Sequence, residues 1–208
     1  VDHFRIRVHG KSTHVSTPHL GVDALYIASQ IVVAVQGLVT RRTSPTEPVI
    51  IGIGKLNAGT TYNAVAAFAE MEGTTRTISQ ESRDRVRAQV SETAQSIAAL
   101  YGGTAEVEWT DFAAALVNDP QVCEEAARVV DELLGAGHVV TDRELSLSGD
   151  NFAEFELYKP GAYAYLGTGN PDLPHTMITN HNGGFDVDEN ALVTGAGLYV
   201  GYTVTRLG

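Results

Sequence analysis

The feature that most constrains the fold of this chain is the alternation of two hydrophobic periods over residues 1–113. Strand signals, in which apolar residues occupy every second position or a short run, occur at 4–8, 49–53, 67–71 and 105–109. Helix signals, in which apolar residues recur every three or four positions, occur at 25–39 and 86–101. The order β-α-β-β-α-β predicts a ferredoxin-like sandwich, in which two helices cover one face of an antiparallel sheet.

The same residues predict which side chains are buried and where the helices end. In the opening strand, Phe4, Ile6 and Val8 face one way, while Arg5 and Arg7 face the other. The predicted stripe of the first helix is Leu25, Ala28, Val32, Val35 and Val39. The predicted inward residues of the next strand are Ala67, Ala69 and Met71. Ser79 is the expected cap of the second helix, and Gly102-Gly103 its end.

Charge divides the chain into two parts. Residues 1–113 carry 10 basic and 11 acidic residues, a net charge of −1, whereas residues 114–208 carry 4 and 14, a net charge of −10. We therefore expect two domains, 1–113 and 114–208. In the second, we expect a helix that starts at Asp119-Pro120 and ends at Gly135, a short buried strand at 161–166 and a final helix capped by Asp186 or Asp188. Gly197 and Gly201 predict a close helix contact.

Composition excludes several classes of partner. With 14 basic against 25 acidic residues the formal net charge is −11, which argues against nucleic acid or an anionic membrane, since both attract Lys and Arg. No apolar run approaches the roughly 18–20 residues that span a bilayer, so we expect no membrane partner. The opening residues lack signal-peptide character. Cys123 is the only cysteine and has no partner for an internal disulfide, which fits a cytoplasmic location.

Three groups of polar residues could carry chemistry. His14 and His19 occupy a polar turn, where a neutral imidazole can donate to an oxyanion or bind a metal. Asn63 and Arg76 lie at opposite ends of one predicted strand and could hold a carboxylate, or could be a turn Asn and a surface Arg. His181 lies in a Gly/Asn loop that allows metal binding, although a zinc site needs at least three protein ligands.

Other polar residues have simpler explanations. Helix capping accounts better than metal binding for the three acidic residues Asp186, Asp188 and Glu189. The segments SGDNF (148–152) and LGTGN (166–170) could line a pocket or be ordinary turns. The chain contains no P-loop, dinucleotide fingerprint, H-E-x-x-H or G-x-S-x-G motif.

Taken together, five segments resemble the zinc-dependent amidohydrolases and exopeptidases that include aminoacylases, hippurate hydrolase, carboxypeptidase G and the auxin-conjugate hydrolases. Two of the five lie in the first half, GKSTHVSTPHLGVDAL (10–25) and AGTTYNAVAAFAEMEGTTRT (58–77). The others are SGDNFAEF (148–155), GAYAYLGTGN (161–170) and HNGGFDVDENAL (181–192). Departures from the family pattern include Ser12 and Thr13 in place of two glycines.

The resemblance implies roles for individual residues. The first domain is similar to the family's inserted lid, which is ferredoxin-like and forms a homodimer. His14 is implied to polarise the scissile carbonyl in the neighbouring subunit's site. Asn63 and Arg76 are implied to hold the carboxylate of a small-molecule amide substrate, also across the dimer, and the turn with Gly167 and Thr168 to contact substrate. His181 is implied to be a metal ligand.

The resemblance also implies metal ligands and a general-base Glu that precede the lid, and no second cluster in residues 1–208 replaces them. We therefore expect an α/β (α+β) chain made of the lid and the C-terminal portion of a metallohydrolase catalytic domain, inactive by itself. Its divalent metal, zinc with manganese or cobalt as alternatives, would be incompletely liganded. The alternatives are a non-catalytic dimerisation or interaction fragment, or a chain completed by a separate N-terminal chain.

Overall fold

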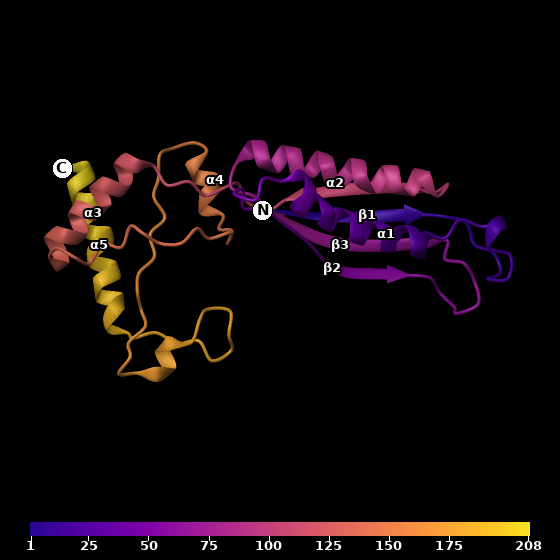
Figure 1. Cartoon of the computed structure of the whole chain (residues 1–208). Helices are drawn as coiled ribbons and strands as arrows, with labels where there is room; N and C mark the ends of the chain where they lie inside the picture. Colours follow the sequence, from indigo (N-terminus) through magenta and orange to yellow (C-terminus); the bar gives the residue numbers. More distant parts are fainter. The chain divides into compact units, whose positions relative to one another are not determined.

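The computed structural model describes residues Val1–Gly208, and the chain divides into two compact units. The first unit comprises Val1–Leu116 together with Ser146–Glu154, and the second comprises Val117–Leu145 and Phe155–Gly208. Figure 1 draws both units in sequence colours. The first unit therefore includes the whole SGDNF segment (148–152) in addition to the region 1–113.

Four strands form one antiparallel sheet in the first unit, in the order β2-β3-β1-β4. They are β1 (Asp2–His9), β2 (Ile50–Ala58), β3 (Phe68–Arg76) and β4 (Thr104–Asp111). Because β1 lies between β3 and β4, Ile6 is opposite Met71 on one side and Val107 on the other. This strand order confirms the predicted ferredoxin-like sandwich.

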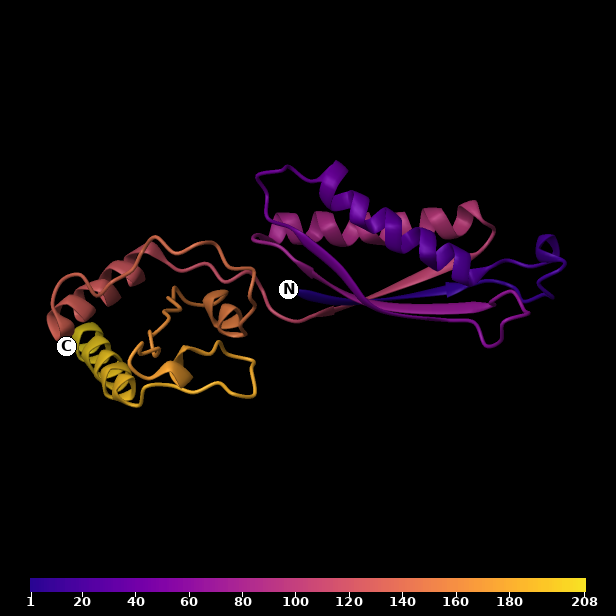
Figure 2. The same cartoon turned by 60° about the horizontal axis from the view of Figure 1, so that its bottom comes forward.

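Two helices cover one face of this sheet. They are α1 (Ala24–Gly37), which continues into the π-helical turn η2 (Leu38–Arg42), and α2 (Gln80–Leu100). A short 3-10 turn, η1 (Pro18–Leu20), precedes α1. Figure 2 shows α1 and α2 on the same side of the sheet.

The core lies between the sheet and the two helices. Its fully buried members include Phe4, Ile6, Val8, Ile27, Ile31, Val35, Ala69, Met71 and Val90. Two predicted positions are wrong: Leu25 is 47% exposed, and Ala67 is exposed because it precedes β3. Most positions of α1 are apolar, so periodicity alone did not define its buried face, which instead includes Ala24, Ile27 and Ile31.

The continuous helix Ala24–Arg42 is, by length and composition, apolar enough to cross a membrane. The core helix of a soluble protein passes the same test, and five residues of α1 are buried against the sheet and α2. No uninterrupted apolar run in the sequence reaches this length, but the helix as a whole meets the test of length and composition. The helical segment includes polar residues such as Gln30 and Gln36, which interrupt the apolar runs.

Both ends of α2 form as predicted. The Ser79 side chain accepts a hydrogen bond from the Ser82 backbone N–H at 3.1 Å, which caps the first turn. At the other end Gly102 has φ +78°, a left-handed conformation that L side chains rarely adopt. A Cβ on Gly103 would lie 2.8 Å from the His9 carbonyl oxygen, so glycine is needed where α2 turns into β4.

The face of the sheet opposite the helices carries a ladder of opposite charges. Arg7 of β1 reaches Glu70 at 3.1 Å and Glu108 at 2.6 Å, on the two neighbouring strands. Arg5 lies 3.6 Å from Glu72, which Lys55 also contacts at 2.7 Å. Individual exposed pairs contribute little stability. The ladder instead explains the strict polar alternation of β1, because its outward side chains remain in water.

A buried ion pair joins the start of β1 to α2. Asp2 is 1% exposed and Arg83 is 8% exposed. Arg83 Nη2 and Nε donate to the Asp2 carboxylate at 2.6 and 3.0 Å, and these bonds raise the pKa of the guanidinium. Arg87 bonds Asp111 at 2.6 Å at the end of β4. Together, these pairs attach the start of β1 and the end of β4 to helix α2.

We expect Arg83→Ala to lower the free energy of unfolding by about 3 kcal/mol, because it leaves the buried Asp2 carboxylate without its cation. Chemical denaturation of the chain measures this loss. Lys55→Ala, which removes an exposed ion pair, is the matched control and should change stability little. If Arg83→Ala lowers the free energy of unfolding no more than Lys55→Ala does, the stabilising role of the buried ion pair is contradicted.

The second unit is built mainly from α3 (Pro120–Leu134) and α5 (Asn190–Leu207), with the short 3-10 turn η3 (Pro174–Met177). A short helix, α4 (Phe152–Glu156), spans the boundary between the units. Asp119 caps α3 by accepting from the Val122 N–H at 3.0 Å, and Gly135 ends it with φ +88°, both as predicted.

The predicted close helix contact also forms. A Cβ on Gly201 would lie 2.8 Å from Val129, and a Cβ on Gly197 would lie 3.0 Å from Leu133, so both glycines let α5 approach α3. The strand predicted at 161–166 is wrong. A strand needs a hydrogen-bonded neighbouring strand, and no strand pairs with this segment; the Asn118 side chain bonds the backbone of Tyr163, and the Asp119 N–H bonds the Gly161 carbonyl oxygen.

Candidate functional site

Two loops meet at one end of the sheet and bring His14 and Asn63 together. The Val15 N–H donates to the Asn63 carbonyl oxygen at 3.1 Å, and the Val65 N–H donates to the Thr13 carbonyl oxygen at 2.9 Å. These bonds form a short antiparallel bridge between His14 and Ala64. The loops 10–23 and 58–67 are therefore joined, although 49 positions separate His14 from Asn63 in the sequence. We call this end of the first unit the tip.

The imidazole of His14 is exposed and oriented by Ser16. The Ser16 backbone N–H donates to His14 Nδ1 at 3.2 Å, and Ser16 Oγ lies 2.7 Å from the same atom. Because a backbone N–H can only donate, Nδ1 acts as the acceptor, and the neutral ring carries its proton on Nε2. Nε2 is thus a hydrogen-bond donor directed to solvent, which is the property needed to polarise a carbonyl.

The Asn63 side-chain amide has a free hydrogen-bond donor. Its Oδ1 accepts a hydrogen bond from Thr61 Oγ1 at 3.1 Å, while Nδ2 has no partner. A hollow of about 390 Å³ lies beside the joined loops, lined by residues that include Val15, Leu25, Gly59, Thr60 and Thr61. The tip therefore combines an imidazole donor and an amide donor at an open surface.

Arg76 lies at the other end of the first unit. It is the last residue of β3, and a nine-residue strand spans roughly 26 Å. A Cβ on Gly149 would lie 3.5 Å from Arg76 Nη1 and 2.7 Å from Val1 Cγ2, so glycine lets the SGDNF segment approach both residues. Within one chain, Arg76 is therefore separated from both His14 and Asn63.

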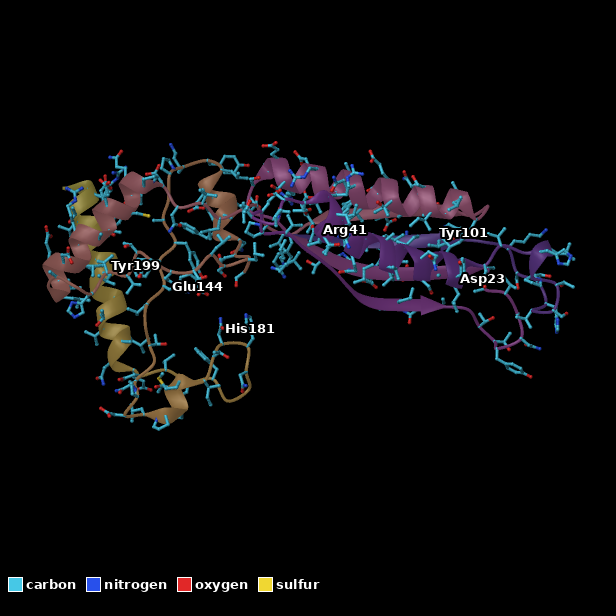
Figure 3. The ribbon with its side chains drawn as sticks, in the orientation of Figure 1. Asp23, Arg41, Tyr101, Glu144, His181 and Tyr199 are labelled. Atoms are coloured by element: carbon cyan, nitrogen blue, oxygen red, sulfur yellow. The ribbon has the colours of Figure 1, made fainter.

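His181 lies in the second unit, in the loop between η3 and α5 (Figure 3). It is exposed and has φ +61°, the left-handed region that few residues other than glycine adopt. Strained backbone of this kind clusters at functional sites. No group of three or more His, Cys, Asp or Glu side chains in the 208 residues is arranged to hold a metal. The residues of this chain do not by themselves form a complete metal site.

The LGTGN turn is tied to the segment that follows His181. The Asp188 N–H donates to the Thr168 carbonyl oxygen at 2.9 Å, and Asn170 Nδ2 donates to Asp188 Oδ2 at 2.7 Å. Asp188 Oδ1 also accepts from the Asn190 N–H at 3.0 Å, in the first turn of α5. The N-cap position of α5 is Glu189, which makes no side-chain cap bond, so the predicted cap at Asp186 or Asp188 was wrong; Asp188 instead accepts from the first residue of the helix. A Cβ on Gly167 would meet only open space, so this turn is accessible at that point.

The hydrogen bonds from Asn170 and Asn190 lower the pKa of Asp188 below its usual value. Its carboxylate therefore stabilises the fold above pH ~4, and the contribution is lost as pH falls through the lower folded pKa. We expect Asp188→Asn to be less stable than the wild type at pH 6, with a difference that shrinks toward pH 3. Denaturation at several pH values measures this. Asp172→Asn, in the same region, is the control. If Asp188→Asn is less stable than the wild type by the same amount at pH 6 and pH 3, the prediction is contradicted.

Sequence reasoning identified His14, Asn63, Arg76 and His181, but it did not single out Ser16, which orients His14, or Tyr62, which precedes Asn63. Ser16 lies two positions after a histidine in a polar turn, and only its hydrogen bonds reveal its role. Tyr62 is 96% exposed in a loop, and hydrophobic periodicity identifies residues of helices and strands, so it could not single out this residue.

Comparisons with known proteins identify the family of the chain. Residues 2–101 match the family model described as the peptidase dimerisation domain. The chain is 34% identical over 196 residues to thermostable carboxypeptidase 1 of Saccharolobus solfataricus, covering 94% of this chain and 49% of that protein. It is 33% identical over 193 residues to N-acetyl-L-cysteine deacetylase of Bacillus subtilis, covering 93% and 44%.

A solved structure has the same fold over nearly the whole chain. The Bacillus subtilis YXEP protein, described as a dinuclear metal-binding peptidase of the M20 family, matches with a TM-score of 0.79 and 27% identity, covering 99% of this chain and 50% of that one. The chain spans about half the length of the curated relatives it matches. This chain belongs to the M20 family of peptidases, and residues 2–101 are its dimerisation domain.

Proposed function

We propose that this chain forms part of a metal-dependent amidohydrolase that cleaves the amide bond of N-acyl amino acids or related small amides. Relatives named for this chemistry include the N-acetyl-L-cysteine deacetylase of Bacillus subtilis and the N-acetyldiaminopimelate deacetylase of a Geobacillus species. Both named substrates contain an acyl amide next to a carboxylate. The observation that carries the proposal is the pairing of His14 and Asn63 at the exposed tip.

His14 acts on the scissile carbonyl. Its Nε2–H donates to the carbonyl oxygen, and this bond strengthens as negative charge develops there during attack by water. The bond from the Ser16 N–H to Nδ1 keeps the proton on Nε2 before the substrate arrives. Preorganisation of this donor is the catalytic contribution of the tip.

The substrate carboxylate is held by residues from two subunits of a homodimer. β3 separates Arg76 from Asn63 by more than their side chains can reach, so the two residues of one chain cannot hold the same carboxylate. We assign Arg76 of one subunit and Asn63 of its partner to one substrate, with His14 of that same partner. This assignment replaces the expectation that Asn63 and Arg76 both act across the dimer on one carboxylate.

His181 is one ligand of the divalent metal, which the family resemblance suggests is zinc. A metal site needs at least three protein ligands, so the others come from residues beyond these 208. The His181 imidazole is exposed and has no competing hydrogen bond.

A second candidate function is a dimerisation module without catalysis. The match of residues 2–101 to a dimerisation domain and the separate core of the first unit favour it. It predicts that the protein containing this chain dimerises but does not hydrolyse any N-acyl amino acid.

We expect His14→Ala to lower kcat for N-acetyl-amino-acid hydrolysis by about 10²- to 10³-fold in the enzyme that contains this chain, since it removes one oxyanion donor. KM should change much less. His19→Ala is the matched control, because His19 is an exposed histidine of the same loop with no hydrogen bond. Equal kinetics for the two variants would exclude His14 from the mechanism.

A further inference from the structure

We propose that Tyr62 is a specificity-determining residue, whose ring packs against the amino-acid side chain of the substrate bound in the partner subunit's site. The proposal rests on the proposed function and deepens it by naming a substrate class: N-acyl amino acids with a large apolar or aromatic side chain. It is carried by the position, exposure and fixed presentation of this tyrosine.

Tyr62 is 96% exposed, the highest value among the large hydrophobic residues of the chain. Its ring stacks on no other aromatic ring, and its hydroxyl has no hydrogen-bond partner. The other two exposed tyrosines of the first unit, Tyr26 and Tyr101, contact each other edge to face with ring centroids 5.1 Å apart. In Figure 3, Tyr101 lies near the same end of the unit as Asp23. Tyr62 alone of the three lacks a partner.

The loop that carries Tyr62 is held in place on both sides of it. Before Tyr62, Gly59 adopts φ +70° and its N–H bonds the Phe68 carbonyl oxygen at 3.4 Å. After Tyr62, Asn63 is fixed by Thr61 Oγ1 on its side chain and by the Val15 N–H on its carbonyl. The ring is therefore presented by an ordered loop, and a tyrosine has only two side-chain torsions to restrict on binding.

The chemistry of the substrate identifies what Tyr62 contacts. In an N-acyl amino acid, a single carbon lies between the amide nitrogen and the carboxylate, and this carbon carries the side chain. The tip offers His14 for the carbonyl oxygen and Asn63 for the carboxylate. Tyr62 directly precedes Asn63 in the same loop, so we assign its ring to the substrate side chain; ring contact with an apolar group is favourable.

The experiment compares N-acetyl-L-phenylalanine with N-acetylglycine in the enzyme that contains this chain. We expect the wild type to favour the phenylalanine derivative in kcat/KM. In Tyr62→Ala the ratio of the two kcat/KM values should fall about ten-fold, which is the range for losing one apolar contact. Tyr62→Phe should keep the wild-type ratio, since the contact is made by the ring.

Tyr199→Ala is the matched control, because Tyr199 is 82% exposed on α5 and belongs to no proposed site. It should keep the wild-type ratio. An unchanged ratio in Tyr62→Ala, or an equal fall for both substrates, overturns the proposal while leaving the proposed function intact if His14→Ala is impaired. Absence of hydrolysis of every N-acyl amino acid by the wild-type enzyme overturns both.

Discussion

The hydrogen-bonded bridge between the loops 10–23 and 58–67 is the interaction on which the candidate site depends. Two backbone bonds, from Val15 to Asn63 and from Val65 to Thr13, join segments that leave the sheet from different strands. They join the loop that carries His14 to the loop that carries Tyr62 and Asn63. Without these bonds the two loops would not be held against each other, and the proposed site needs residues from both.

The length of the sheet is the second feature that constrains the candidate site, because it separates the tip from Arg76. β3 has nine residues, so its length places a guanidinium and an amide that suit the same carboxylate at opposite ends of one unit. A dimer resolves this separation, since the tip of one subunit can complete the site of the other. We propose that the dimerisation domain contributes residues to the catalytic site as well as to the assembly.

The sequence predicted the elements whose signals are local. The alternation of Phe4, Ile6 and Val8 identified β1, and Ser79 and Gly102 identified the ends of α2. Two predictions failed for different reasons. The buried face of α1 was misassigned because most positions of this helix are apolar, and the strand predicted at 161–166 did not form because no neighbouring strand is there to pair with it. His14 and Asn63 were recognisable by type, but their proximity follows from a long-range bridge that no local pattern contains.

Mixed dimers test the central claim that Arg76 and the tip of the partner subunit serve one site. Differently tagged His14→Ala and Arg76→Ala subunits would be combined in the enzyme that contains this chain, and the mixed dimer purified by both tags. One of its two sites then carries both substitutions, and the other carries neither. The account predicts that each variant homodimer is nearly inactive and that the mixed dimer has about half of the wild-type kcat. An inactive mixed dimer would contradict it, because each site would then draw both residues from one chain.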